Sequence, residues 1–261
     1  MISILEALIL DNAVSLFQMF SQRVRQTVYR AGSRMSIRRL TGDSSPVITR
    51  PLLEYCHLHS SPLPPTLQAL QSHSALSFSN SHMMTGPEVL KLNMLLCTAI
   101  RANKVLDIGV FTGSSSLAAA LATDDHSKIF AIEKSKKYIE FARDHWKRAG
   151  VDHKIEVMIG NAGDSLNQLM NSGHAATFDF IYIDADKSRY TEYFQQAIQL
   201  SRSGGILAVD NTLFRGEVLD SQTDKKTVLA VQAFNEFARD CPEVTVILLP
   251  VSDGLTLAIK K

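Results

Sequence analysis

Residues 178–187 read Phe-Asp-Phe-Ile-Tyr-Ile-Asp-Ala-Asp-Lys, and this stretch decides both the predicted fold and the predicted site. Its first part is a mostly apolar run of β-branched and aromatic side chains, which is typical of a strand buried on both faces. The run ends abruptly in Asp184, Asp186 and Lys187. Because parallel sheets bind ligands just beyond the carboxyl ends of their strands, we expect these polar side chains to lie in a ligand crevice.

A second stretch repeats this pattern, with the apolar run Gly205–Val209 followed directly by Asp210 and Asn211. Two neighbouring strands would then deliver polar side chains to the same crevice. Together with Asp184 they offer three hard oxygen donors, which suit a magnesium-like cation that keeps some positions for water or substrate.

Strand and helix patterns alternate through the C-terminal part of the chain. Strands are predicted over 104–108, 128–132, 155–159, 180–184 and 206–210, and helices over 113–122, 136–149, 162–170, 190–200 and 224–239. Two final strands, 244–249 and 255–259, are joined by so short a turn that they must be antiparallel. The alternation predicts an α/β fold with a doubly wound, mostly parallel sheet, preceded by helices over 51–103.

The N-terminal extension 1–50 differs from the predicted domain 51–261. It is apolar up to residue 20, then rich in arginine and nearly free of acids, which resembles an organelle transit peptide. A membrane-surface anchor and an extension without an address are the alternatives. Three scattered cysteines leave one unpaired, which favours an intracellular setting, and the choice between mitochondrial and cytoplasmic stays open. No apolar run is long enough for a transmembrane span. The net charge of +1 gives no sign of a nucleic-acid partner.

The stretch Asp107–Gly113 follows the first strand of the alternating part and opens a helix. Glycine at Gly109 lets the backbone approach a ligand closely, and the start of the helix offers free N–H groups. Glu133 ends the next strand, where an acid typically accepts hydrogen bonds from the ribose of a nucleoside. These features predict an adenosine-type cofactor, although the glycines do not have the spacing of the dinucleotide fingerprint.

Each of these motifs also has a structural interpretation. Asp210 and Asn211 could form a turn capped by its own side chain, and Lys187 could be a surface lysine paired with Asp186. A glycine-rich turn after a strand is often only structural, and Glu133 could be a solvated strand end.

The order of the motifs resembles that of the cation-dependent O-methyltransferases. Their sequence is Asp107–Gly113, Gly150–Ile155, Phe178–Lys187, Gly204-Gly205 with Asp210–Leu213, and Leu249–Thr256. Residues 51–261 resemble the caffeoyl-CoA and catechol O-methyltransferase group, and most of all the animal catechol-O-methyltransferase-domain-containing proteins. The resemblance implies S-adenosylmethionine as cofactor, a divalent cation such as Mg²⁺, and a homodimer. It also implies a Rossmann-like, seven-stranded sheet with an antiparallel last strand.

The resemblance also assigns roles to individual residues. The metal ligands would be Asp184, Asp210 and Asn211, with Lys187 as the catalytic base beside Asp184. The positions that line the methyl donor would be Thr85, Asp107, Gly109, Ser115, Glu133, Ala162 and Asp186, with His82, Met83 and Met84 in the segment that covers it.

The residues and the resemblance together predict an O-methyltransferase that acts on a hydroxyl of a small catechol-like or phenylpropanoid-like molecule. A catalytically silent, cofactor-binding interaction protein is the alternative, and a nicotinamide-dependent dehydrogenase is disfavoured by the glycine spacing. Phe214-Arg215 stands where many relatives have tryptophan followed by a small residue, and Ser114 where many have tyrosine. Both departures concern the pocket, so we expect an unusual acceptor.

Overall fold

The computed structural model describes residues 50–261, so the predicted extension lies almost entirely outside the described residues. The chain divides into two compact units, Met1–His59 and Ser60–Lys261. The described part of the first unit contains helix α3 (Arg50–Leu58). All the predicted site residues belong to the second unit, and the domain boundary after residue 50 stays a prediction.

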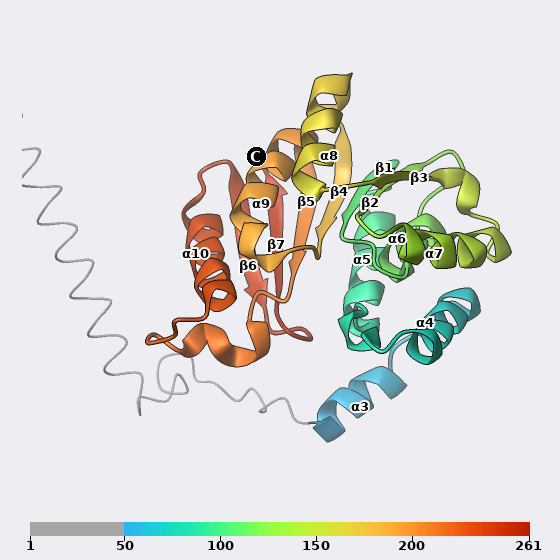
Figure 1. The fold of residues 1–261 in the computed structure, drawn as a ribbon, viewed down its shortest axis with the longest axis horizontal. Helices are drawn as coiled ribbons and strands as arrows, with labels where there is room; N and C mark the ends of the chain where they lie inside the picture. The colour runs from blue at the N-terminus through green and yellow to red at the C-terminus, as the bar shows by residue number, and fades with distance from the viewer. Residues whose placement is uncertain (1–49) are drawn as a thin grey trace, which may run out of the picture. The chain divides into compact units, whose positions relative to one another are not determined.

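Helices and strands alternate in the second unit as the sequence predicts (Figure 1). They are α4 (Pro65–Ser77), α5 (Pro87–Ala99), β1 (Lys104–Ile108), α6 (Ser114–Leu121), β2 (Lys128–Glu133), α7 (Lys136–Arg148), β3 (Ile155–Ile159), α8 (Ala162–Leu169), β4 (Phe178–Ile183), α9 (Tyr190–Leu200), β5 (Ser201–Asp210), α10 (Lys226–Asp240), β6 (Val244–Leu249) and β7 (Leu255–Lys260). Within residues 50–261, no helix combines the length and the apolar character needed to cross a membrane.

The strands form one seven-stranded sheet in the order β3-β2-β1-β4-β5-β7-β6. Strands β1 to β5 pair in parallel, and β7 runs antiparallel to both of its neighbours. The predicted fold class is therefore confirmed, including the antiparallel last strand. Strands β1 and β4 lie side by side at the centre, where the order of the chain reverses, and this is where such sheets bind ligands.

Two separate apolar clusters cover the two faces of this sheet. Side chains of α4 to α7 belong to one cluster and side chains of α8 to α10 to the other. Figure 1 shows these two groups of helices on opposite sides of the sheet. On β4, Phe180 and Tyr182 belong to the first cluster while Ile181 and Ile183 belong to the second. Because successive side chains of a strand alternate between faces, Asp184 is expected on the same face as Tyr182.

Strand β5 begins five residues earlier than the sequence predicts, at Ser201 instead of residue 206. Its pairing with β4 shifts register between Phe178 and Phe180, so the entry of the strand is irregular. Gly204 has φ +73°, and a Cβ on Gly205 would lie 2.3 Å from the Ser201 hydroxyl oxygen and 3.0 Å from the Phe178 carbonyl oxygen. Two glycines shortly after a predicted helix are typical of its end, but here they allow this bulged approach of two backbones.

Candidate active site

A cavity of about 1070 Å³ opens at the carboxyl ends of the parallel strands. The predicted site residues that line it are Thr85, Gly109, Glu133, Ala162, Asp184, Asp186, Lys187, Asp210 and Asn211, together with His82, Met83 and Met84. Asp107 and Ser115 are not among its lining residues. The structure therefore brings the predicted ligand set and most of the predicted donor positions to one cavity.

Asp184 directly follows β4, and Asp210 is the last residue of the adjacent strand β5. Strand alternation places both on the face of the sheet that is covered by α4 to α7. The Asp184 N–H donates to the Ile108 carbonyl oxygen over 2.8 Å, which fixes the backbone just beyond β4. Lys187 Nζ donates to Asp184 Oδ1, and both side chains are largely buried. One ammonium group thus faces a pair of neighbouring carboxylates.

Asp210 is 3% exposed and is held at three atoms. Its Oδ1 accepts the Asn211 N–H over 2.7 Å, its Oδ2 accepts the Tyr182 hydroxyl, and its carbonyl oxygen accepts the Tyr190 hydroxyl over 2.8 Å. Burial and the Asp210 and Asp184 carboxylates raise the pKa of Tyr182 well above its ordinary value, so this phenol keeps its proton and donates. Asp210 is therefore oriented before any ligand arrives.

Tyr182 has a role in the site that its sequence pattern does not predict, because the pattern identifies it only as part of a buried strand. Its hydroxyl also lies 3.3 Å from Thr85 Oγ1, so one phenol joins the segment before α5 to the end of β5. Strand alternation could have identified it, because a polar tip two residues before Asp184 must point to the same face.

The charges of Asp184 and Asp210 favour the binding of a cation. Burial raises the pKa of Asp184 to about 7, the adjacent Lys187 ammonium opposes that rise, and the Asp210 carboxylate adds to it. Burial also raises the pKa of Asp210, against the hydrogen bonds from Tyr182 and Asn211 that lower it. Two buried carboxylates with a single ammonium are costly unless a further positive charge compensates them, so the residues fit a divalent cation.

Asn211 adds an amide to the two carboxylates, and it adopts φ +58°, a conformation that asparagine tolerates better than most residues. Among residues 50–261, no group of three or more histidine, cysteine, aspartate or glutamate side chains could hold a metal ion. Two carboxylates and one amide oxygen would therefore need water or substrate oxygens to complete a shell, as magnesium sites commonly do.

At the other end of the cavity, Glu133 is held by two backbone groups. Its Oε2 accepts the Phe111 N–H and its Oε1 accepts the Ser135 N–H, each over 2.9 Å. A carboxylate oxygen has two lone pairs, so both oxygens can still accept a hydrogen bond from a ligand in the cavity. The arrangement suits the ribose contact that the sequence predicts for this position.

Gly109 is required for a second reason, in addition to the predicted approach of a ligand. Its φ is +96°, and a Cβ there would lie 2.4 Å from the Asp184 carbonyl oxygen and 2.9 Å from the Ala185 Cα. The glycine therefore lets the turn after β1 pack against the backbone that carries Asp184.

Asp107 lies beneath the cavity and not in its wall. Its Oδ2 accepts hydrogen bonds from the Ser115 hydroxyl over 2.7 Å and from the Ser116 hydroxyl, and it is 1% exposed. Its Oδ1 has no hydrogen-bond partner among the described residues. Burial raises the pKa of Asp107 to about 6, although the two serine hydroxyls lower it. An orphaned buried acceptor of this kind marks a place where a donor from a bound group would be stabilising.

Replacing Asp107 by asparagine is expected to weaken the pH dependence of stability. The folded-state pKa of about 6 lies above the ordinary 3.8, so the bound proton stabilises the fold fully below about pH 4, and this stabilisation is lost as the pH rises through 6. The shift corresponds to about 3 kcal/mol at neutral pH. Urea unfolding measures the free energy of unfolding near pH 4 and near pH 7 for wild type and Asp107→Asn. The exposed Asp164→Asn is the matched control. Equal pH slopes for Asp107→Asn and wild type would contradict this assignment.

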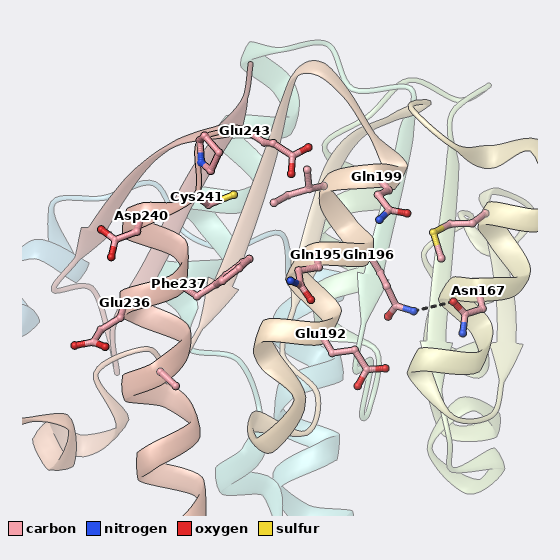
Figure 2. A pocket seen from close by; sticks show the side chains of 14 residues that line it. Asn167, Glu192, Gln195, Gln196, Gln199, Glu236, Phe237, Asp240, Cys241 and Glu243 are labelled. Atoms are coloured by element: carbon pink, nitrogen blue, oxygen red, sulfur yellow. Dashed lines mark hydrogen bonds between the residues drawn. The ribbon is translucent and has the colours of Figure 1, made fainter. Parts of the chain in front are cut away.

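A second cavity, of about 850 Å³, lies between α8, α9 and α10, beside the short segment that precedes β6 (Figure 2). Its rim carries the carboxylates of Glu192, Glu236, Asp240 and Glu243, and its wall is lined by glutamine side chains. Glu192 is already paired with Arg189 over 2.6 Å. None of the predicted site residues lines this cavity.

Comparison with known proteins identifies relatives of this chain. A model of the O-methyltransferase family matches residues 57–261. Probable caffeoyl-CoA O-methyltransferase 3 of Dictyostelium discoideum is 38% identical over 229 residues, which cover 82% of this chain and 91% of that protein. Catechol O-methyltransferase domain-containing protein 1 of Mus musculus is also 38% identical over 229 residues, covering 88% of this chain and 85% of that protein.

Solved structures agree with these relatives. The O-methyltransferase TomG of Streptomyces achromogenes, in complex with SAM, superposes with a TM-score of 0.72 at 30% identity and covers 80% of this chain and 95% of its own. An O-methyltransferase of Bacillus cereus in complex with SAH gives a TM-score of 0.73 at 30% identity, with 80% and 96% covered.

Proposed function

Because the chain belongs to the O-methyltransferase family, we propose that it transfers the methyl group of S-adenosylmethionine to a hydroxyl of a catechol-like or phenylpropanoid-like molecule, with the help of a divalent cation. Family membership itself makes the chain a methyltransferase that uses S-adenosylmethionine. The acceptor, the cation and the roles of single residues are the parts that we propose.

The observation that carries the proposal is the buried carboxylate pair with one ammonium group. We assign the cation to Asp184, Asp210 and Asn211, with Mg²⁺ as the natural choice for hard oxygen ligands. A bound divalent cation would favour the phenolate form of an acceptor whose pKa of ~10 otherwise keeps it protonated at neutral pH. These three residues would leave coordination positions for other ligands, and two adjacent hydroxyls would suit them, which supports a vicinal diol as acceptor.

We assign the methyl donor to the end of the cavity that contains Glu133, with Thr85, Gly109, Ala162 and Asp186 around it and Asp107 and Ser115 beneath it. Glu133 is already fixed by two backbone N–H groups, so it is oriented for ribose hydroxyls without further cost. The fixed walls of the cavity would hold donor and acceptor in line, and such alignment can contribute up to roughly 7–11 kcal/mol.

We assign the acceptor proton to Lys187. Lys187 lines the cavity, and its Nζ donates to Asp184 Oδ1, which holds it beside the proposed cation ligands. To act as a base it must first release a proton of its own.

The test is a panel of catechols incubated with labelled S-adenosylmethionine, with and without a chelator. We expect methylation that is lost on chelation and restored by Mg²⁺. Turnover that survives chelation would contradict the role of the cation. No turnover on any acceptor, with S-adenosylmethionine binding intact by calorimetry, would favour a silent cofactor-binding protein, and binding of NAD instead would indicate a dehydrogenase.

Other expectations from the sequence also stay proposals. They are a homodimer, contact of the N-terminal extension with a membrane surface, and an intracellular location that is either mitochondrial or cytoplasmic.

A further inference from the structure

The turn that follows Asn211 is held in an unusual backbone conformation beside the cavity. Phe214, Arg215 and Gly216 have φ values of +45°, +56° and +79° in succession. Left-handed conformations of residues other than glycine cost about 1–3 kcal/mol each, and they persist only where the surroundings over-determine them. Such strain at a cavity wall suggests that the side chains presented there have a function.

The surroundings of this turn do over-determine it. The N–H groups of Thr212 and Leu213 donate to the carbonyl oxygens of Gly254 and Asp253 over 3.0 and 2.9 Å. The Arg215 N–H donates to the Asp253 carboxylate. A Cβ on Gly254 would lie 2.5 Å from the Leu213 nitrogen, so the two loops pack backbone to backbone. Arg215 is therefore presented at the cavity from a rigid base.

None of the described residues pairs with the charge of Arg215. Neighbouring cations are paired, Lys187 with Asp184 and Arg189 with Glu192. The nearest acid along the turn, Glu217, is paired with Lys225 over 2.8 Å. Among the described residues, the Arg215 guanidinium has no ion pair and no hydrogen bond, although the residue lines the cavity.

The position of Arg215 decides which ligand it can meet. It lies four residues after Asn211, at the proposed acceptor end of the cavity, whereas Lys134 follows Glu133 at the proposed donor end. An arginine fork pairs with carboxylate or phosphate through two parallel hydrogen bonds, which is the strongest interaction such a side chain can make.

We propose that Arg215 determines acceptor specificity by binding an anionic group, so that the preferred acceptor is a vicinal diol that carries a carboxylate or phosphate away from the hydroxyls. This inference rests on the proposed function, because it places the diol beside Asp184, Asp210 and Asn211. The anionic group could belong to a free hydroxycinnamic acid or to the phosphates of its coenzyme A thioester, and both present the same chemistry to a guanidinium.

Three acceptors that share one aromatic diol test this inference: caffeic acid, caffeoyl-CoA and the neutral caffeyl alcohol. We expect Arg215→Gln to lower kcat/KM for whichever anionic acceptor is preferred by about tenfold or more, because a hydrogen-bonded ion pair is lost. Arg215→Lys should retain part of the preference. The matched control is Arg148→Gln, which removes the same charge from an exposed position outside the cavity. A loss confined to caffeic acid identifies the carboxylate, and one confined to caffeoyl-CoA identifies the phosphates.

An equal loss with caffeyl alcohol, or no loss with either anionic acceptor, would overturn the role of Arg215. If wild type methylates none of the three, the proposed function fails, and Arg215 is then tested by binding alone. Calorimetry with S-adenosylhomocysteine present should still show weaker binding of the anionic diols to Arg215→Gln than to wild type, and equal affinities would overturn the inference.

Discussion

Replacing Asp210 by asparagine is expected to lower methyl transfer by at least about a hundredfold, while the protein still folds and binds its methyl donor. Loss of groups that merely hydrogen-bond to metal ligands already costs about 10–100-fold in affinity or activity, and the loss of a ligand charge should cost more. Asparagine keeps the shape of the side chain. Its amide oxygen can still accept the Asn211 N–H, and its NH2 group can donate to the Tyr182 hydroxyl oxygen in place of accepting from it.

Two measurements separate this effect from misfolding. Calorimetric titration with Mg²⁺ or Mn²⁺ should show weaker cation binding to Asp210→Asn, and titration with S-adenosylmethionine should show nearly unchanged affinity. The exposed Asp164→Asn is the matched control and should behave as wild type in both. Without cation, Asp210→Asn should unfold at no lower urea concentration than wild type, because burial already raises the pKa of Asp210 and makes its charge costly. Cation-stimulated turnover equal to that of wild type would remove Asp210 from the ligand set.

The central part of this site could be predicted because two buried strands end in carboxylates. Runs such as 178–183 and 206–209 identify strands by composition alone, and the parallel arrangement brings their carboxyl ends to one edge of the sheet. Strand alternation then puts the residues that follow on one face, as the two apolar clusters show. The resemblance carried by the order of the motifs is likewise confirmed by the family model and the relatives.

Features that depend on close contacts between distant segments could not be predicted. The sequence places Asp107 at the end of a strand beside the predicted ligand crevice, yet the start of α6 covers it. Its hydrogen bond from the Ser116 hydroxyl is one that no motif predicts. The glycines at 204 and 205 resemble a helix stop, and only the pairing of β5 with β4 shows that they allow a bulge. A sequence pattern records residue types and spacings, whereas these roles depend on which backbone lies within a few ångströms.

Gly109→Ala is expected to destabilise the protein by about 3 kcal/mol or more. A left-handed φ costs an alanine roughly 1–2 kcal/mol, and forcing a methyl group into a packed region adds about 1–3 kcal/mol. Here the obstacle is backbone, since the new Cβ would lie 2.4 Å from the Asp184 carbonyl oxygen and 2.7 Å from the carbonyl carbon. Neither atom can move away without moving the end of β4.

Gly173→Ala is a control that isolates the contact from the strain. Gly173 has φ +80°, close to the +96° of Gly109, but a Cβ there would meet no heavy atom within 4 Å. Urea unfolding should therefore give a loss of about 1–2 kcal/mol for Gly173→Ala, from the backbone conformation alone. Similar losses for the two variants would contradict the close approach of the Gly109 turn to Asp184. A larger loss for Gly109→Ala, accompanied by weaker cation binding, would show that the position of the Asp184 carboxylate depends on the absence of a side chain in the turn after β1.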